Sequence, residues 1–344
     1  MRNKPNDIAY LGCRADKIKS AQPELNVENF IHLHRWVTDR YAVHIKKDIL
    51  KQPAPWTDNG IIREFRFTNV RREHDKETKW VIENVCKADL TSANKWMNLI
   101  LFRMINKSET CKNFMPIDFE NVDWGKICTY IQNTPAEYVM FTNAFRTCGV
   151  KGASNKALGV TSAHKDKENG VPPLVAVIGY CKKLYDEGVL VHSISQATTA
   201  QAVFETLQSV PGIGYFLAYQ IFVDSTYCPE SLFSENEFVV AGPGARRGLD
   251  LVFENRDGMT YEESLFWLRD NWVSICAWLN LPWNPDEIFV DLEPEDRYMN
   301  VMSLQNCHCE ISKYIRAVNG TGRPRNKYHY NTVDHGQISF FTEV

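Results

Sequence analysis

Apolar residues recur every three or four positions along much of the chain, the spacing that places them on one face of an α-helix. The first such stripe, in residues 29–50, consists of Phe30, Leu33, Val37, Tyr41 and Ile45. Similar stripes cover residues 90–105, 172–185, 262–279 and 304–318. Alternation with the period of a β-strand is short and weak. The pattern predicts a mostly α-helical protein.

Breaks between these stripes suggest how the chain is organised. They fall at Pro53 and Pro55, in a Gly/Ser/Lys-rich segment over 149–170, and at Pro282 and Pro285. We expect an N-terminal helical extension, two helical lobes with a cleft between them, and a tail; the ranges are 1–52, 53–170, 171–330 and 331–344. The lysines of segment 149–170, together with His164, fit either a loop over a polyanion or a solvated connection.

A short motif lies between two apolar helical segments: Val210-Pro211-Gly212-Ile213-Gly214. Glycines at such a place permit a tight turn and expose backbone N–H groups at the start of the next helix. The motif resembles the hairpin of the helix-hairpin-helix DNA glycosylases, so Pro211, Gly212 and Gly214 are candidate contacts to a DNA phosphate. An ordinary turn between two helices is the alternative.

The same resemblance has a gap where that superfamily carries its catalytic aspartate. Ala241 stands at the corresponding place, and Phe216 occupies the position of the lysine found in bifunctional members. Asp224, Glu235 and Glu237 lie nearby in the sequence. Loss of the aspartate removes the main support for base excision.

Composition narrows the class of protein. The 344 residues carry 39 Lys+Arg and 42 Asp+Glu, a formal net charge of −3, which argues against a polybasic nucleic-acid binder. Ten cysteines are present without any Cys-x-x-Cys pair, so no zinc or iron–sulfur site is expected. With no apolar signal core and no membrane-length apolar run, we expect a cytoplasmic protein.

Although the net charge of the chain is close to zero, three of its segments are rich in cations. Residues 61–80 hold six cations and four acids, interleaved with Phe65 and Phe67. The segment Gly242-Pro243-Gly244-Ala245-Arg246-Arg247-Gly248 is predicted to be a compact turn suited to phosphate. Residues 312–330 hold five cations, among them Lys313, Arg323, Arg325 and Lys327, and no acid. If segment 61–75 is helical, Asn69, Arg72 and Asp75 fall on adjacent faces.

Taken together, these stretches resemble a phage-associated family, the α-glutamyl/putrescinyl-thymine pyrophosphorylases, also described as the helical domain associated with hydroxymethyluracil DNA kinases. The segments that carry the resemblance are Pro55-Trp56-Thr57-Asp58, Arg66-Phe67-Thr68-Asn69-Val70, Arg72-Glu73-His74-Asp75, Leu101-Phe102-Arg103-Met104-Ile105-Asn106, Phe238 to Ala245, and Cys309 to Pro324. They cover roughly residues 53–330.

The resemblance implies thymidine hypermodification in viral DNA, on a helix-hairpin-helix glycosylase-like scaffold. Hydroxymethyluracil, phosphorylated by a DNA kinase, is flipped out of the duplex, and an amine displaces its phosphate or pyrophosphate. The donor is an amino acid such as glycine or glutamate, or a polyamine such as putrescine. The modified DNA resists host restriction, and the reaction takes place in the cytoplasm of an infected bacterium. No metal or other cofactor is expected.

Roles for individual residues follow from this interpretation. Arg63 and Arg72, together with Arg246, would stabilise the departing phosphate. Asp75 or Glu73 would deprotonate the amine. Asn69 or Asn143 would form hydrogen bonds with the edge of the uracil. Further candidates for base or substrate contacts are Asp58, Phe67, Arg103, Asn106, Glu310 and Lys313. The candidate DNA phosphate contacts, besides the hairpin, are Gly242, Gly244, Arg246, Arg247, Arg323, Arg325 and Lys327.

Two other functions stay open at this point. A non-catalytic helix-hairpin-helix module that recruits the modifying enzymes would bind DNA without any chemistry. A glycosylase acting on a modified base would use Asp224 or Glu237. Addition of a cysteine to the uracil ring is a further, weaker possibility for the transferase.

Overall fold

The structure is a computed structural model, and it describes residues 15–135, 137–142, 172–322 and 327–328. Within these ranges the chain is mostly helical, as the apolar stripes predict, with one two-stranded antiparallel sheet. It forms two compact units, residues 1–16 with 72–240 and residues 17–71 with 241–344. None of the described helices has both the length and the apolar character needed to cross a lipid bilayer.

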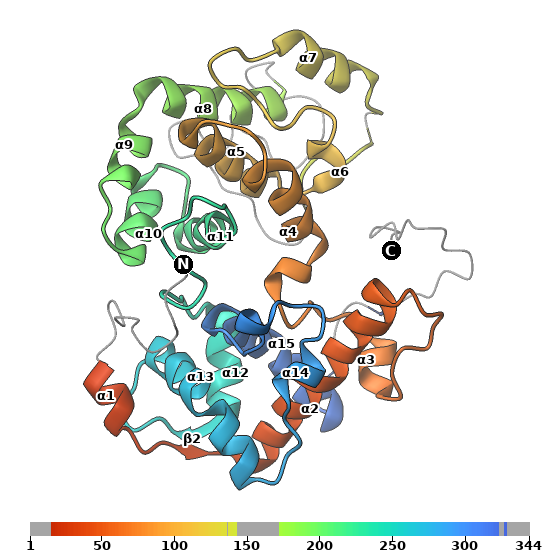
Figure 1. Ribbon diagram of the computed structural model, residues 1–344. Coiled ribbons are helices and arrows are strands. Elements are labelled where there is room, and N and C mark those ends of the chain that lie inside the picture. Colours follow the sequence, from red (N-terminus) through yellow and green to blue (C-terminus); the bar gives the residue numbers. More distant parts are fainter. Residues whose placement is uncertain (1–14, 136, 143–171, 323–326, 329–344) are drawn as a thin grey trace. The chain divides into compact units, whose positions relative to one another are not determined.

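In the second of these units, the N-terminal helical segment packs with the C-terminal helices. Helix α2 contacts α12 and α15. Figure 1 shows α2, drawn in red, among the cyan and blue helices of its unit. Position along the chain does not reveal such long-range packing. The expected loop segment 149–170 and the tail 331–344 lie outside the described residues.

The unit of residues 1–16 and 72–240, here called unit 1, contains the following elements: η3 (Arg72–His74), α4 (Lys76–Val81), η4 (Ile82–Cys86), α5 (Ser92–Ile105), α6 (Ser108–Cys111), α7 (Trp124–Asn133), α8 (Pro173–Glu187), α9 (Val189–Ser195), α10 (Ala200–Ser209) and α11 (Tyr215–Ser225). Helix α5 is central, since α6, α8, α9, α11 and η4 all pack against it. Its residues 97–105 are all buried, which explains the strong apolar stripe in this part of the sequence.

Two asparagines of α5 fix the chain that follows α6. The Asn98 side chain donates to the carbonyl of Ile117 and accepts from its N–H, both at 2.8 Å. Asn94 accepts from the Phe119 N–H at 2.8 Å. These amides satisfy buried backbone groups that no helix or sheet pairs, and this keeps the connection in one place.

The other unit, unit 2, contains α1 (Ala15–Ser20), β1 (Glu24–Leu25), α2 (Val27–His44), η2 (Ile45–Ile49), α3 (Gly60–Glu64), α12 (Pro243–Val252), β2 (Phe253–Asn255), α13 (Tyr261–Trp278), α14 (Pro285–Ile288), η5 (Pro294–Asp296) and α15 (Val301–Val318). Strands β1 and β2 pair antiparallel. The core contains a chain of aromatic rings: Phe30 and Trp272 are 5.2 Å apart between centroids, Trp272 and Trp283 also 5.2 Å, and Trp283 and Phe289 5.9 Å. The aromatic residues of stripe 262–279 therefore serve packing in large part.

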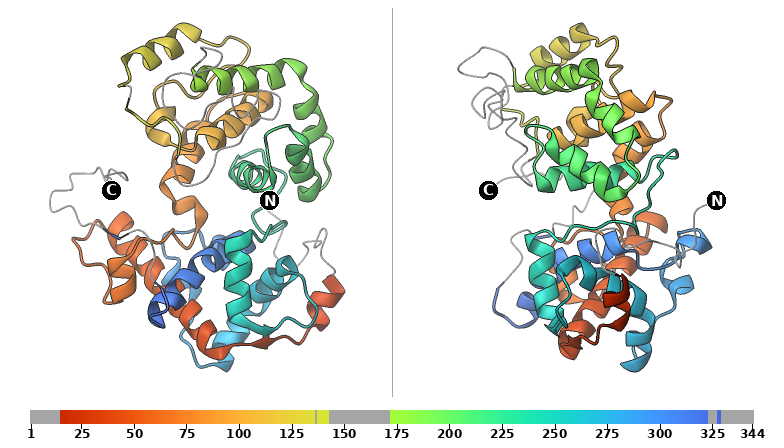
Figure 2. Two further views of the ribbon diagram at one scale, coloured as in Figure 1. Left: turned by 180° about the vertical axis from the view of Figure 1, so that it is seen from behind. Right: turned by 90° about the vertical axis from the view of Figure 1, so that its left-hand side faces the viewer.

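Helices α12 and α15 form the closest helix pair of unit 2 and lie side by side in the views of Figures 1 and 2. A Cβ atom on Gly248 would lie 2.1 Å from the carbonyl oxygen of His308, and one on Gly244 would lie 3.3 Å from Cys309 Sγ. The two glycines, one turn apart, let the helix backbones approach each other. The glycine-rich segment is therefore the first turns of a helix, capped by Gly242 with Pro243 at its first position, and is not the compact turn that its composition predicts.

Segment 61–75 is not one continuous helix, so the condition for placing Asn69, Arg72 and Asp75 on adjacent helix faces is not met. Helix α3 ends at Glu64, residues 65–71 carry no helix, and a short 3-10 turn over Arg72–His74 precedes α4. The side chain of Asn59 caps α3 by accepting from the N–H groups of Ile61 and Ile62. Asn69, Arg72 and Asp75 therefore do not share a helix, and the boundary between the two units falls between Arg71 and Arg72.

Candidate functional site

The candidate residues divide between the two units. Arg72, Glu73 and Asp75 belong to unit 1 with the hairpin, whereas Arg63, Asn69 and the C-terminal cations belong to unit 2. Asn143, Arg323 and Arg325 lie outside the described residues. The contacts of these residues therefore fall into two sets, one within each unit.

In unit 1, Arg72 lies at the start of η3 and is 9% exposed. Its Nη2 donates to Gln220 Oε1 at 2.5 Å, a neutral acceptor on α11. Its Nε is shielded from solvent and has no acceptor within the ranges that the structure describes. A buried donor without an acceptor costs about 1–3 kcal/mol, so this guanidinium has unused capacity for an anion.

Asp75 and Glu73 flank the same turn. Asp75 is the N-cap residue of α4, with φ −71° and ψ 140°, and its side chain makes no capping hydrogen bond. Its carbonyl accepts from the Lys79 N–H at 2.8 Å, so its backbone begins the helix. The three residues thus come within one short stretch, Arg72–Asp75, with an acid on either side of His74.

Arg103 has a different environment. It pairs with Asp224 through Nε–Oδ2 and Nη2–Oδ1 contacts, both 2.5 Å, and it also donates to Asn106 Oδ1 at 2.7 Å and to Thr78 Oγ1 at 3.2 Å. Its exposed fraction is 3% and that of Asp224 is 0%. Burial disfavours the charge, but the Asp224 carboxylate outweighs this and raises the pKa of Arg103.

This buried network engages Arg103 in four hydrogen bonds and occupies the side-chain oxygen of Asn106. We therefore assign both residues to holding α5 against α11 and do not use them as substrate contacts. The same network engages Asp224, a candidate glycosylase acid, in an ion pair with Arg103 at a fully buried position.

Helix α11 links the hairpin to both arginines. Gln220 and Asp224 stand one helical turn apart on α11, so one receives Arg72 and the other Arg103. The turn before this helix, between α10 and α11, has Gly212 at φ 86°, a left-handed conformation that favours glycine. Tyr180 anchors the turn by donating to the Pro211 carbonyl at 2.7 Å.

The hairpin presents an open helix start. Gly214 is the N-cap residue of α11, makes no side-chain cap, and has no atom within 4 Å of where a Cβ would lie. Tyr215 and Phe216 follow, 40% and 49% exposed. Backbone N–H groups at such a start suit a phosphate oxygen. The structure has a tight turn with a positive-φ glycine before α11; the likeness of this turn to the DNA-binding hairpin and its contact with DNA stay predictions.

In unit 2, Asn69 is held from two sides. Arg40 Nη2 donates to its Oδ1 at 2.8 Å, and Asn306 Nδ2 donates to its carbonyl at 2.7 Å. Phe67 lies edge-on to Trp36 and Tyr314, with centroid separations of 6.0 and 6.2 Å. Both candidates therefore come from an extended segment that α2 and α15 fix in place.

Two of the three cationic segments meet in unit 2. Lys327 pairs with Phe65 in an antiparallel bridge, its Nζ lies 3.3 Å from Glu64 Oε1, and Tyr328 N–H donates to the Glu64 carbonyl at 2.7 Å. Arg63 is exposed at the end of α3, next to this bridge. Segments 61–66 and 327–328, far apart in the sequence, thus form one surface.

The remaining candidates of unit 2 lie apart from that bridge. Glu310 is 4% exposed and its Oε1 lies 2.6 Å from Lys313 Nζ. Arg246 donates from Nε to the Ala241 carbonyl at 2.8 Å and lies over the Tyr261 ring at 5.2 Å. Asp58 and Arg247 are exposed. No contact between described residues brings Arg246 to Arg63 or Asn69.

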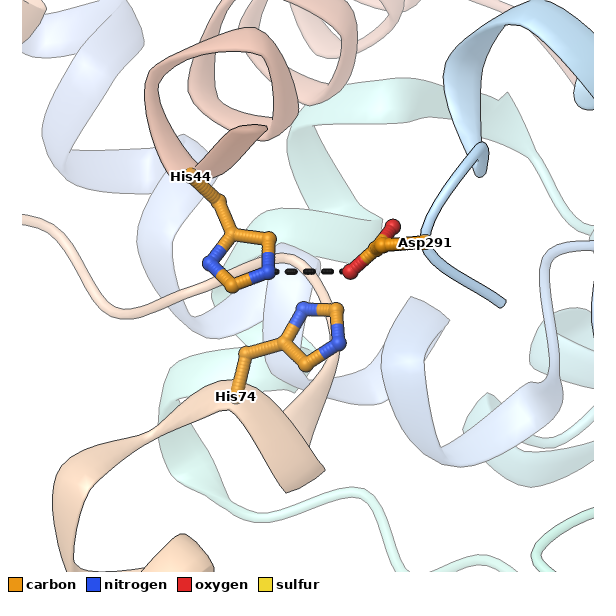
Figure 3. A group of neighbouring side chains, drawn as sticks. All are labelled: His44, His74 and Asp291. Atoms are coloured by element: carbon orange, nitrogen blue, oxygen red, sulfur yellow. Dashed lines mark hydrogen bonds and ion pairs between the residues drawn. The ribbon is translucent and has the colours of Figure 1, made fainter. Parts of the chain in front are cut away.

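A buried histidine of unit 2 was not singled out by the sequence. His44 lies between two carboxylates: its Nδ1 is 3.0 Å from Asp48 and its Nε2 is 3.1 Å from Asp291, the latter contact drawn in Figure 3. Burial lowers the pKa of His44, but the hydrogen bonds to Asp291 and Asp48 and their charges outweigh it, so the pKa is raised. The spacing His44-x-x-x-Asp48 is the one signal that the sequence offers.

Three buried cysteines are unsuited to nucleophilic attack. Burial raises the pKa of the Cys111 and Cys307 thiols well above the ordinary value. A hydrogen bond with Cys228, followed by burial, raises that of Cys86. Since the thiolate is the reactive form, these three side chains are inert at neutral pH.

Three residues that the sequence did not single out hold candidate residues in place from distant helices: Gln220, Arg40 and Asn306. No local motif marks them.

Comparison with known proteins gives the following. Residues 28–323 match the family described as "5-hmdU DNA kinase, helical domain". The chain is 23% identical over 294 residues to a protein of Bacillus phage SP10 named "5-hmdU DNA kinase". The alignment covers 81% of this chain and 44% of that relative, so the chain spans less than half of the relative's length. No solved structure matches the chain.

Proposed function

The chain belongs to the family described as the helical domain of 5-hmdU DNA kinases, and on that premise we propose that it is a transferase of thymidine hypermodification in phage DNA. Its substrate is double-stranded DNA that carries phosphorylated 5-hydroxymethyluracil, prepared by a hydroxymethyluracil DNA kinase. Its second substrate is an amino acid or a polyamine. The product protects viral DNA from restriction in the cytoplasm of the infected bacterium.

The reaction balances as a substitution at the exocyclic methylene. The C–O bond to the phosphate, or pyrophosphate, breaks, and the leaving group departs with the electron pair. A C–N bond forms with the amine, and the proton of its ammonium form passes to a carboxylate. The uracil ring can delocalise positive charge at the methylene while the phosphate leaves, and this requires a base that is extruded from the stack.

The environment of the Arg72 guanidinium is the main support for this proposal. A guanidinium held by the neutral amide of Gln220, with a buried Nε for which the described part of the chain offers no acceptor, is suited to receive a phosphate. Asp75 and Glu73 lie within three residues and supply the candidate bases. We propose Arg63 and Asn69 as further contacts, to the phosphate and to the uracil edge.

The hairpin supports the DNA-binding part. In our proposal, the backbone N–H groups at the start of α11 bind one DNA phosphate. The same helix carries Gln220, which accepts the hydrogen bond from Arg72. A scaffold of the glycosylase type would hold the flipped base while its glycosidic bond survives, since Ala241 replaces the catalytic aspartate and Asp224 is ion-paired with Arg103. The cations at 63, 246–247 and 327 add backbone contacts.

The test mixes DNA containing phosphomethyluracil with glycine, glutamate or putrescine and follows the nucleosides by mass spectrometry. A transferase yields an aminated nucleoside, and Arg72→Gln lowers the rate by about a hundredfold or more, as expected for a lost charge-stabilising donor. Lys79→Gln, a half-buried cation in the last turn of α4, serves as control. A module that only recruits enzymes gives no new nucleoside, and a glycosylase gives free base and alkali-labile strands; either result would refute the proposal.

A further inference from the structure

A surface cavity of about 420 Å³ lies in unit 2, where the end of α12 passes into β2 and the turn before α13. Its polar wall consists of Asp250, Glu254, Asn255 and Arg256, and its apolar part of Phe253 and Met259. The volume is within the range of small-molecule sites, roughly 300–1,000 Å³. None of these residues has a role in the proposed function.

Arg256 is oriented in this cavity but not saturated. Its guanidinium carbon lies 3.8 Å from the centroid of the Tyr261 ring, which fixes the plane of the guanidinium by stacking. Its Nη2 is 3.8 Å from Asp250 Oδ1, too far for a hydrogen bond. A stacked guanidinium whose ion pair with Asp250 is this long, with no hydrogen bond in it, keeps N–H groups with which it can bind a carboxylate ligand through two parallel hydrogen bonds.

The two acids of the wall are held in place by other contacts. Tyr261 Oη donates to Asp250 Oδ2 at 3.2 Å, and the side chain of Asp250 is 51% exposed. Asn26 Nδ2 donates to Glu254 Oε1 at 3.2 Å. The cavity therefore presents one guanidinium and two carboxylates from neighbouring positions, a pattern of opposite charges that is complementary to a zwitterion.

We propose that this cavity binds a small α-amino acid with an uncharged side chain, its carboxylate on Arg256 and its ammonium group between Asp250 and Glu254. A diamine would leave Arg256 facing a second positive charge. An acidic amino acid would bring an additional carboxylate to a wall whose side-chain charges, from two acids and one arginine, already sum to −1.

The location gives the bound amino acid a role, and that role rests on the proposed transferase function: it is the amine donor. Arg246, a candidate phosphate contact, lies 5.2 Å from the same Tyr261 ring on which Arg256 stacks. Tyr261 thus orders a phosphate-binding and a carboxylate-binding guanidinium side by side in one unit. The amine donor would then be held in unit 2, next to Arg246.

The experiment titrates full-length protein with glycine, glutamate and 1,4-diaminobutane by calorimetry, in the absence of DNA, and repeats the glycine titration by NMR. Glycine is expected to bind most tightly. Arg256→Gln and Asp250→Asn weaken glycine binding about tenfold or more, and Arg256→Lys has an intermediate effect because it keeps the charge and loses the fork. Matched controls are Arg35→Gln and Asp286→Asn, exposed ion-paired residues of the same unit that leave glycine binding unchanged.

Two results would overturn the inference. One is no binding of any of the three compounds to folded wild-type protein, and the other is diamine binding that equals glycine binding and is insensitive to Arg256→Gln. Failure of the site and failure of the transferase function are separable. Glycine binding without an aminated nucleoside in the DNA assay refutes the function alone, whereas amination whose glycine KM is unaffected by Arg256→Gln refutes the site alone.

Discussion

Two arginines of unit 1 show how much the partner of a residue decides its role. Arg103 is neutralised by Asp224, and Arg72 is held by the uncharged Gln220. Both partners lie on α11, 121 and 148 residues further along the chain. The sequence marks both arginines as candidates, but it cannot separate a structural from a binding arginine, because the distinction depends on contacts across such distances.

Replacing Arg103 by Met is expected to destabilise the protein by about 3–5 kcal/mol, because Asp224 would keep its charge in a fully buried position. The double variant Arg103→Met/Asp224→Leu should recover a large part of this loss. Urea unfolding measures both. Lys182→Ala breaks a pair with the 55% exposed Asp186 and serves as control, with an effect below about 1 kcal/mol. Equal effects of the buried and the exposed substitution would contradict the assignment.

His44 makes unfolding depend on pH in a definite direction. Its pKa is raised above the ordinary 6.5 by Asp291 and Asp48 against the effect of burial, so the folded protein binds the proton more tightly than the unfolded chain. The stabilisation is fully present below pH 6.5 and is lost as pH rises through the folded-state pKa. Urea midpoints between pH 5 and 9 should therefore show a decline above 6.5 that His44→Gln removes. A decline of the same size in that variant would contradict the prediction.

At the scale of elements, apolar periodicity predicts the long helices well. The stripes at 90–105, 262–279 and 304–318 correspond to α5, α13 and α15 within three residues at each end. Segments whose local signal is polar or glycine-rich are predicted less well. Glycines in residues 242–248 suggest a turn, yet they serve the packing of α12 on α15, a contact that no local property encodes.

Gly248→Ala tests this packing. Its added Cβ would meet the backbone of His308 at 2.1 Å, and a backbone cannot rotate away, so we expect a loss of about 3 kcal/mol, the upper end of ordinary overpacking. Thermal unfolding measures it. Gly60→Ala, at the start of α3 with no atom within 4 Å of the new Cβ, should change stability by less than about 1 kcal/mol. Comparable losses in both variants would speak against a close α12–α15 approach.

On the scale of the whole molecule, the net charge of −3 is a poor guide to partners, since cations gather in short segments. The structure joins two of these segments through the Phe65–Lys327 bridge and leaves Arg246 at a separate position of unit 2. The division of the chain was beyond prediction for the same physical reason: α2 belongs with α12 and α15 through packing alone.

A protein that holds DNA through one hairpin and a few arginines should make about three to five phosphate contacts. The logarithm of its DNA affinity is then expected to fall against the logarithm of salt concentration with a slope of about −3 to −5. Fluorescence anisotropy between 50 and 300 mM salt, as a rough working range for such slopes, gives the value. Lys327→Gln should reduce the slope by about 1. A slope near −10 would require a far larger basic surface than these residues provide.

Transfer of an amine to the modified base is tested most directly with ¹⁵N-labelled amine and DNA that contains phosphomethyluracil. We expect a thymidine derivative that carries the label, formed together with one equivalent of released phosphate or pyrophosphate. Arg72→Gln is expected to suppress this reaction. Unlabelled nucleosides with intact phosphomethyl groups, or free modified base with abasic sites, would contradict it.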